Sequence, residues 1–496
     1  MRIVSNENQL RPGMLSIRRW EFPAFVIAGA VAMVMIASVL NHYGPAAVVL
    51  LLALPLVVIA GALAFGQGTS NIRALRRELT WWHALWFAMF LSALVFRIRD
   101  VTEVKTDLLD GPATFRLTME ALVVLGLLWR LLTRRPPWTR PLFRGLVGAL
   151  AAYSLVCAVS ALWSVYPSWT LYKAGEFLLD VALLSAILAT MRSAREFKAV
   201  FDWTWTLYGL LLLFAWAGVV LWPSEALEAP SARLHGIFPI EGSNAIGTSG
   251  AILAIVALSR LLPIERHKQK RAWYFAILGY GVISMIMAQT RNALAGFVFA
   301  VLLILIFSHR TWMAALLSLG LSPVVLYTGL KGGLINYLQR EQQQDTITSL
   351  TGRMDWWLYA WNQWLQHPLT GLGAYAAGRF GVLGKLGAGA ASSLHSDYIE
   401  VLVGTSFWGM IPFLAALFGT WWWLIRSVRD NRFAMVERQL ALEAIGVLGV
   451  VTIHSFFNTE LCWHAPVLFL VVLGYAELLR QRRKTRVQTL EPWQYA

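Results

Sequence analysis

Long apolar stretches separated by short polar connections run through most of this 496-residue chain. A helix that crosses a bilayer needs about 20 mostly apolar residues, and the pattern predicts about fourteen such helices. They are centred near residues 32, 56, 89, 124, 154, 182, 213, 254, 281, 300, 320, 413, 449 and 471. Those near 89, 124 and 182 carry His83, Glu120 and Asp180 and are less regular. We predict an all-α polytopic integral membrane protein with about 12–14 transmembrane helices.

One long polar stretch interrupts this pattern and divides the chain into four parts. Residues 1–328 are expected to form a bundle of transmembrane helices, and residues 329–399 a long loop with short helices outside the membrane. Residues 400–480 return to the membrane, and residues 481–496 form a tail. Ionisable residues beside membrane spans are energetically costly and are usually kept for a function. We therefore expect the functional residues in this loop and at the start of the following span.

The composition agrees with a membrane protein, with 57% hydrophobic and 14% charged residues. A net charge of +15 could indicate nucleic-acid binding, but the basic residues are spread among short loops rather than gathered on one face. Alternate loops and the N-terminal arm hold about 30 of the 42 Lys and Arg residues. The positive-inside rule therefore predicts cytoplasmic N- and C-termini and an external long loop. The N-terminal arm has no cleavable signal pattern, so the first span is expected to be retained.

Neither a metal nor a cofactor is expected. The two cysteines, Cys157 and Cys462, fall in or beside predicted spans, which speaks against a structural disulfide or a thiolate metal site. The nine histidines show no HxxxH or HExxH spacing. The glycine-rich stretch from 368 to 393 lacks the spacing of a nucleotide-binding P-loop.

Three arginines are candidates for binding a phosphate group. Arg353 follows Thr351, a possible helix cap, and opens a Trp-rich helix whose end is predicted before His367 and Pro368; helix N-termini and guanidinium groups both attract anions. Arg291 lies in a tight turn between two spans, with no carboxylate nearby in sequence. Arg233 lies in the external loop 223–242.

Polar and aromatic residues near these arginines are expected to support the site. Asn244 is predicted to cap a span rich in small residues that allow close helix packing. Trp356 follows Arg353, and Trp357, Trp361 and Trp364 form a stripe that favours packing over ligand stacking.

His395 is the candidate general base. It stands between the long loop and an apolar span in the run His395, Ser396, Asp397, Tyr398 and Glu400. We expect Asp397 and Glu400 to raise its basicity, since nearby carboxylates favour the charged imidazole.

Further along, His454 and Glu460 lie near the external end of another span. We expect this pair to position other residues of the site rather than to take part in the reaction.

The order of these motifs resembles the O-antigen ligase and polymerase superfamily of bacterial envelopes. The resemblance covers about residues 230–475 and rests on Arg291 after a span, TGR with following tryptophans, GLGAY, and HSDYIE before a span. In the ligase branch a His is followed by Asn, Ser or Gln, nine residues, Gly, two residues and a small residue. His395, Ser396 and Gly409 match that signature, and Ser406 replaces its first Gly.

The resemblance implies a GT-C-like membrane glycosyltransferase that moves preassembled O-antigen from undecaprenyl diphosphate to lipid A-core oligosaccharide. It implies that Arg291 and Arg353 hold the diphosphate and that His395 activates the acceptor hydroxyl; Arg233 and Asn244 are carried over more weakly. The setting would be the periplasmic face of a Gram-negative inner membrane, among membrane lipids, with no nucleic acid. Such transfer has a good leaving group, so cationic stabilisation and a base suffice, without a metal, and direct attack would invert the anomeric configuration.

Other functions stay open. Within the superfamily a polymerase would extend the glycan, and a protein O-oligosaccharyltransferase would use a Ser or Thr acceptor. A single large external loop favours the ligase. A lipid or solute transporter would have charges near mid-membrane and an internal repeat; the sequence has no convincing repeat, and its charges gather on one side.

Overall fold

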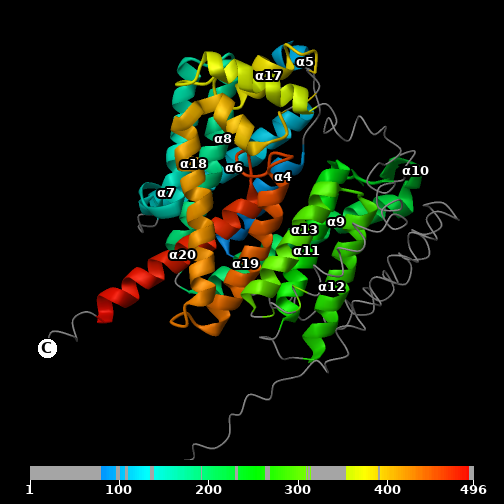
Figure 1. Cartoon of the computed structure of the whole chain (residues 1–496), viewed down its shortest axis with the longest axis vertical. Helices are drawn as coiled ribbons and strands as arrows, with labels where there is room; N and C mark the ends of the chain where they lie inside the picture. Colours follow the sequence, from blue (N-terminus) through cyan, green and yellow to red (C-terminus); the bar gives the residue numbers. More distant parts are fainter. Residues whose placement is uncertain are drawn as a thin grey trace, which may run out of the picture. The chain divides into compact units, whose positions relative to one another are not determined.

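Helices make up nearly all of the regular structure in this computed structural model (Figure 1). It describes residues 80–95, 101–106, 110–133, 139–191, 193–228, 233–262, 268–308, 310, 313, 315, 353–388, 391 and 393–490, all in the unit that begins at Val58. The predicted spans near residues 32, 56 and 320 and the proposed cap Thr351 lie outside the described residues.

Twelve of the described helices have fourteen residues or more. The longer ones are α4 (Trp81–Leu94), α6 (Gly111–Thr133), α7 (Gly145–Val159), α8 (Pro167–Thr190), α9 (Ala194–Leu221), α11 (Ser243–Leu261), α12 (Lys268–Met287), α13 (Arg291–Phe307), α17 (Arg353–Gln366), α18 (Asp397–Arg429), α19 (Met435–His454) and α20 (Val467–Leu490). Short turns are α5 (Val101–Thr106), η2 (Arg140–Phe143), η3 (Ser160–Leu162), α10 (Pro223–Ala226) and the π-helix η4 (Ala377–Leu383).

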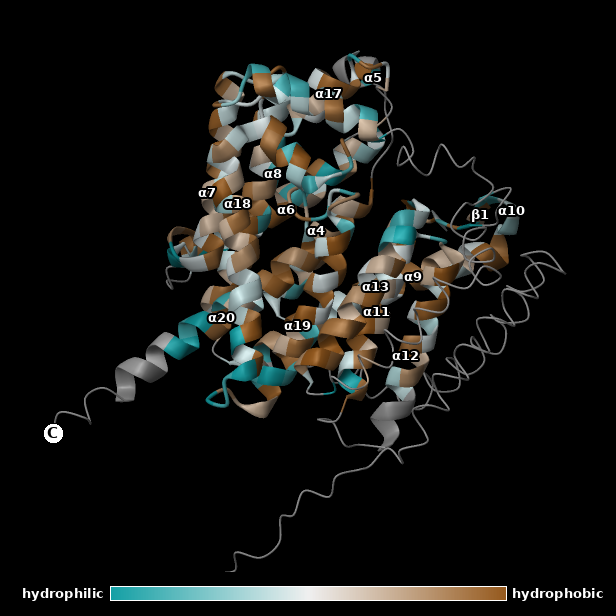
Figure 2. Cartoon of the chain, viewed as in Figure 1, coloured by the Kyte–Doolittle hydropathy of each residue, from teal (hydrophilic) through white to brown (hydrophobic). Residues whose placement is uncertain are grey.

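The helices have the length and composition of membrane spans. Among the described residues, four are long and apolar enough to cross a bilayer: Gly145–Leu162, Glu196–Leu221, Ser243–Leu261 and Asp397–Arg429. Trp81–Leu94, Trp273–Met287 and Arg291–Phe307 are apolar but shorter. Figure 2 shows hydrophobic residues concentrated along the helices, and hydrophilic ones in the α18–α19 connection and the later part of α20. The chain is an all-α polytopic membrane protein, and its total number of spans stays a prediction.

Small residues bring neighbouring helices close together, as the sequence predicted for the span after Asn244. In α11, a Cβ on Gly250 would lie 2.6 Å from the carbonyl oxygen of Gly281 in α12. A Cβ on Gly281 would lie 2.5 Å from the carbonyl oxygen of Gly250. The two backbones are therefore in direct contact, which is how helices gain packing energy where water does not drive their association.

Ion pairs join the predicted cytoplasmic ends of three helices. Arg260 at the end of α11 lies 2.7 Å from Asp202 near the start of α9. It also forms a two-bond contact with Glu443 of α19, at 2.7 and 2.9 Å, and Trp205 donates to the same carboxylate. The start of α11 and the end of α19 meet at the opposite end of the bundle, where the candidate site lies.

The connection between α9 and α11 folds into two minimal hairpins. Strand β1 (Leu227–Glu228) pairs antiparallel with β2 (Arg233–Leu234), which sets Glu228 opposite Arg233. Strand β3 (Gly236–Ile237) pairs with β4 (Ile240–Glu241) directly before α11. These short strands are the only departure from an all-helical fold in the described part of the chain, and they fix the place of Arg233.

Helix α17 lies across the end of the bundle at which α18 begins (Figure 1). Its Ala360 and Trp364 pack in one apolar cluster with Leu372 and Val403. The predicted end of this helix is confirmed, because α17 stops at Gln366 before His367 and Pro368. Trp364 is buried while Trp361 is 46% exposed, so the predicted stripe packs only in part.

Candidate active site

Two arginines lie side by side where α11 and α13 begin. Arg233 donates to the Ala288 carbonyl at 3.4 Å and lies 3.3 Å from Glu228. Arg291 is the first residue of α13, and its charge and that of Arg233 are close enough to repel each other. Glu228 offsets part of this charge, and two neighbouring guanidinium groups suit the pair to a phosphate.

The start of α13 is fastened to the start of α11. Thr290, the residue before Arg291, donates from its hydroxyl to the Ser243 carbonyl at 3.0 Å. A Cβ on Gly247 would lie 2.6 Å from the same hydroxyl, so the glycine permits this approach. The contact fixes the position from which Arg291 extends.

Asn244 does not cap α11, contrary to the sequence prediction. The cap position is Gly242, and the helix begins at Ser243, so Asn244 lies inside the first turn. The hairpin β3–β4 leads the chain directly into the helix one residue after Glu241, which moves the helix start two residues earlier than the sequence pattern indicated.

Arg353 and His395 form a second basic group. Arg353 opens α17 and donates from Nη1 to the Phe457 carbonyl at 2.8 Å. The positive charge of Arg353 lowers the pKa of the nearby His395 imidazole. The rings of Trp356 and His395 are nearly parallel, with centroids 6.3 Å apart. The structure thus brings Arg353, Trp356 and His395 together.

The backbone of His395 is strained. Its φ angle is +54°, in the left-handed region that non-glycine residues rarely adopt. Strain of this kind costs about 1–3 kcal/mol and collects at functional sites. Ser396 follows in the N-cap position of α18, and its side chain makes no capping hydrogen bond.

A chain of side-chain contacts orients His395. Nδ1 of His395 lies 3.4 Å from Oδ1 of Asn458, and Nδ2 of Asn458 donates to Glu460 at 3.3 Å. Because the carboxylate takes the NH₂ side of the amide, the amide oxygen faces the imidazole, and Nδ1 must carry the proton. In the neutral ring, Nε2 is then the basic nitrogen.

The same carboxylate reaches a second histidine. Oε1 of Glu460 lies 3.1 Å from Nδ1 of His454, whose Nε2 lies 3.0 Å from the Thr248 hydroxyl. Thr248 also donates to the Asn244 carbonyl at 2.9 Å, which links α11 to the group. His454 therefore lies between Glu460 and Thr248, and the Thr248 contact is one that the sequence did not indicate.

Burial and charge keep His395 neutral. Burial, together with the positive charge of Arg353, lowers the pKa of His395 from 6.5 to about 4, against a smaller rise from the contact with Asn458. The expectation that Asp397 and Glu400 raise its basicity is wrong. A neutral imidazole at physiological pH can accept a proton without first losing one.

The two carboxylates near His395 in sequence are turned to the backbone. Asp397 accepts from the N–H groups of residues 460, 461 and 462 at 2.8, 3.0 and 3.2 Å, and from the Cys462 thiol. Glu400 accepts from the Leu394 N–H at 2.6 Å. Both lie in the first turn of α18, and they fix the chain on either side of the imidazole.

Tyr398 also serves the connection after α19. Its hydroxyl lies 3.1 Å from that of Ser455, and its ring contacts Phe456 with centroids 4.5 Å apart. Tyr398 thus contacts the start of this connection through both a hydrogen bond and ring packing.

Glu241 is a residue that the sequence reasoning missed. It lies in β4 with only 6% of its surface exposed. Burial and the charge of Glu460 raise the pKa of Glu241 to about 8, so the carboxyl is protonated at neutral pH. Asn458 was missed as well, although it stands in the same short run as His454 and Glu460.

The backbone at Ser406 shows why the ligase signature has a glycine at this position. Its φ angle is +53°, at a kink inside α18, where a glycine would be free of strain. The Ser406 hydroxyl donates to the Pro368 carbonyl and accepts from the Trp364 indole at 3.3 Å. These bonds hold the kink against α17, so the serine fills the position by a different means.

A comparison with protein families gives one match. Residues 275–414 match a family described as O-Antigen ligase. The matched stretch contains Arg291, Arg353 and His395, whereas Arg233 and the Asn458–Glu460 pair lie outside it. No curated protein matches the sequence at a significant level. This match over residues 275–414 is consistent with the O-antigen ligase superfamily.

Proposed function

We propose that this protein transfers preassembled O-antigen polysaccharide from undecaprenyl diphosphate to lipid A-core oligosaccharide. The observation that carries the proposal is the neutral, oriented His395 beside Arg353, with the Arg233 and Arg291 pair at the same end of the bundle. The superfamily match supports a lipid-linked glycan as the donor. We place the reaction at the periplasmic face of a Gram-negative inner membrane, with both termini cytoplasmic, from the distribution of basic loops.

The arginines would bind the donor diphosphate. As the bond between the anomeric carbon and the phosphate oxygen breaks, negative charge builds on the diphosphate, and guanidinium groups in a partly buried site stabilise it. Removal of one such group typically costs about 100-fold or more in rate. Arg353 and Arg291 are assigned to this role, with Arg233 beside Arg291.

His395 would act as general base. The acceptor hydroxyl gives its proton to Nε2 as its oxygen attacks the anomeric carbon, and the diphosphate leaves with the bonding electrons. The imidazolium that forms would be unfavourable beside Arg353 alone, but the departing diphosphate offsets both charges. Glu460 orients the ring through Asn458, an arrangement that matches the base-and-orienter pattern of other transferases. A single displacement of this kind inverts the anomeric configuration.

Purified protein in lipid tests the proposal with undecaprenyl diphosphate glycan as donor and lipid A-core as acceptor, read as a shift to high-molecular-weight lipopolysaccharide. Wild type and Arg426→Ala, whose arginine lies near the far end of α18, are expected to form product. Folded His395→Ala, Arg353→Ala and Arg291→Ala are expected to lose it.

The choice of acceptor separates the alternatives. Product only with a second lipid-linked glycan would make the protein a polymerase, and product only with a protein acceptor would make it an oligosaccharyltransferase. Movement of lipid between leaflets with no transfer to any acceptor would indicate a transporter. A retained anomeric configuration would contradict the single displacement.

A further inference from the structure

The connection from residue 455 to residue 466 carries the groups that orient the two histidines. It joins the end of α19 to the start of α20, and its first half contains Phe457, Asn458 and Glu460. A connection without secondary structure holds a catalytic geometry only if it is fastened to rigid elements. Two carboxylates on different helices do this.

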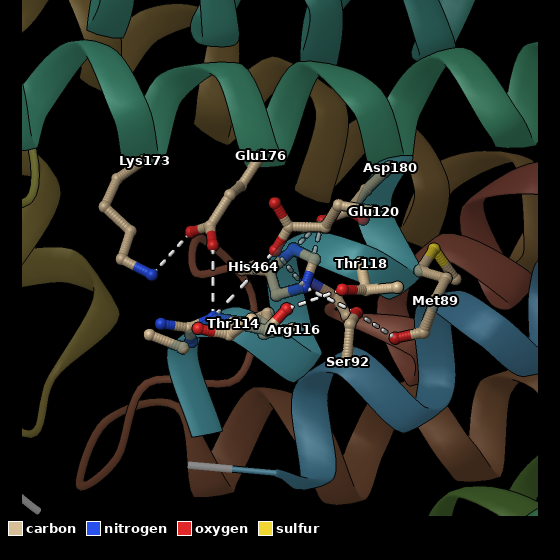
Figure 3. A network of polar contacts seen from close by, with 12 residues as sticks. Met89, Ser92, Thr114, Arg116, Thr118, Glu120, Lys173, Glu176, Asp180 and His464 are labelled. Carbon is tan, nitrogen blue, oxygen red and sulfur yellow. Dashed lines mark hydrogen bonds and ion pairs between the residues drawn. The ribbon is translucent and has the colours of Figure 1, made fainter. Parts of the chain in front are cut away.

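Asp397 fastens the middle of the connection, through three N–H groups and the Cys462 thiol. Asp180 of α8 fastens its end. One oxygen of Asp180 accepts from the Ala465 N–H at 2.6 Å and lies 3.1 Å from Nδ1 of His464 (Figure 3). Both anchors lie on the C-terminal side of Asn458, the first at residues 460–462 and the second at His464 and Ala465.

His464 has both ring nitrogens engaged. Nε2 lies 2.8 Å from the Ser92 hydroxyl, whose own proton goes to the Met89 carbonyl at 2.6 Å. The hydroxyl must therefore accept from Nε2, and Nδ1 faces the carboxyl group of Asp180. These contacts hold the His464 ring between α4 and α8.

Behind His464 lies a buried group of charges on α6 and α8 (Figure 3). Arg116 is 3.4 Å from Glu176 and 3.9 Å from Glu120, and Lys173 is 2.5 Å from Glu176. Glu120 is also 3.6 Å from His464. With Asp180, three carboxyl groups thus face three basic groups inside the bundle.

The same group contains ligand types for a metal ion, since ligand atoms of Glu120, Glu176 and His464 lie within 4.8 Å of one another. The contacts argue against that use. Both ring nitrogens of His464 already have hydrogen-bond partners, and Arg116 and Lys173 already pair with the carboxyl groups. A rigid ion network fits these contacts better than a cation site.

We propose that Asp180 and His464 are positioning residues for the transfer reaction. By fixing the end of the 455–466 connection to α8 and α4, they set the place of Asn458 and thereby the orientation of His395. This inference rests on the proposed function, and it extends the reaction's machinery to helices outside the stretch that matches the family.

A double-mutant cycle tests the inference. Asp180→Ala and His464→Gln are expected to lower kcat by about 10- to 100-fold, because a catalytic group displaced by about 1 Å can cost that much. KM for the donor should change little, since the arginines stay in place. The effects of Asp180→Ala and Asn458→Ala should be far from additive, because both act through one contact. Asp202→Asn, which changes a paired carboxylate near the start of α9, away from the candidate site, is the matched control and should keep wild-type kcat.

The pH dependence distinguishes positioning from a general loss of stability. The Asn458 contact raises the pKa of His395, so its loss should move the acid limb of kcat to lower pH in Asp180→Ala. Additive effects, or a folded Asp180→Ala with wild-type kcat, would overturn the inference. If Asp180→Ala does not fold, Asp180→Asn, which keeps an acceptor for the Ala465 N–H, is used in the same cycle.

Hydrogen exchange keeps the test independent of the proposed function. Amides in residues 455–462 should exchange faster in Asp180→Ala than in wild type and unchanged in Asp202→Asn. Absence of transfer by wild type would contradict the proposed function, whereas unchanged exchange in this stretch would contradict the anchor itself.

Discussion

The charge of Arg353 is predicted to set the pH at which His395 works, and Arg353→Gln tests this. In wild type, burial and Arg353 lower the pKa of His395 from 6.5 to about 4, a difference worth about 3 kcal/mol. Below this pKa the ring is protonated and cannot accept the acceptor's proton. The acid limb of kcat/KM, which reports the free enzyme, should therefore lie near pH 4. Removing the guanidinium should move the limb upward, but not to 6.5, because the burial remains.

The assay is glycan transfer by purified protein, followed as kcat/KM across the acid range, with Arg426→Gln as the control. Arg353→Gln should also lose about 100-fold in kcat/KM through weaker stabilisation of the diphosphate. The pH at which the acid limb of kcat/KM lies does not depend on this 100-fold decrease in the maximum value. A wild-type limb near 6.5, or a limb that stays fixed in Arg353→Gln, would refute the electrostatic argument even if transfer itself occurs.

Three further predictions concern stability, measured by thermal unfolding in detergent. Glu443→Ala should lower the free energy of unfolding by about 3–5 kcal/mol, because it removes the carboxylate that makes two hydrogen bonds to the buried Arg260. A decrease below about 1 kcal/mol would contradict this. Gly373→Ala should lower Tm more than Gly387→Ala, because both have positive φ but only the first would place a Cβ against another side chain; equal losses would show that packing is irrelevant there. Glu241→Gln should stabilise the protein increasingly as pH rises from about 4.5, where the unfolded carboxyl ionises, to about 8, where the native carboxyl ionises, and the gain should then level off. An effect independent of pH would count against that pKa.

Helices and some of their ends could be predicted from sequence because apolar length and proline positions act locally. The end of α17 before His367 and Pro368 follows from the chain's own sterics. The close packing of α11 on α12 follows from Gly250 and Gly281. Alternation of the helices also predicted that Arg233 and Arg291 lie at the same end, and the two are neighbours.

The environment of His395 could not be predicted, because its partners are distant in sequence. Asp397 and Glu400 are close along the chain, but in the first turn of a helix their side chains turn to backbone N–H groups instead. The partner of the imidazole, Asn458, comes from a connection 63 positions away. Proximity in sequence therefore gave the wrong sign for the pKa of His395.

The early start of α11 has a similar cause. A polar residue before an apolar run is a good local predictor of a cap, and Asn244 fits it. The hairpin β3–β4 overrides that preference by delivering the chain to the helix at Gly242. The network of Asp180 and His464 was equally hidden, because it joins residues 284 positions apart.

The most direct test of the central claim is the single-turnover rate of glycan transfer with saturating donor, compared between wild type and His395→Gln. Glutamine keeps a polar side chain but supplies no basic nitrogen. The account predicts a fall of about 100-fold or more in the rate of transfer, with donor binding unchanged, as expected for loss of a general base. Transfer at the wild-type rate by folded His395→Gln would contradict the assignment of His395 as the base.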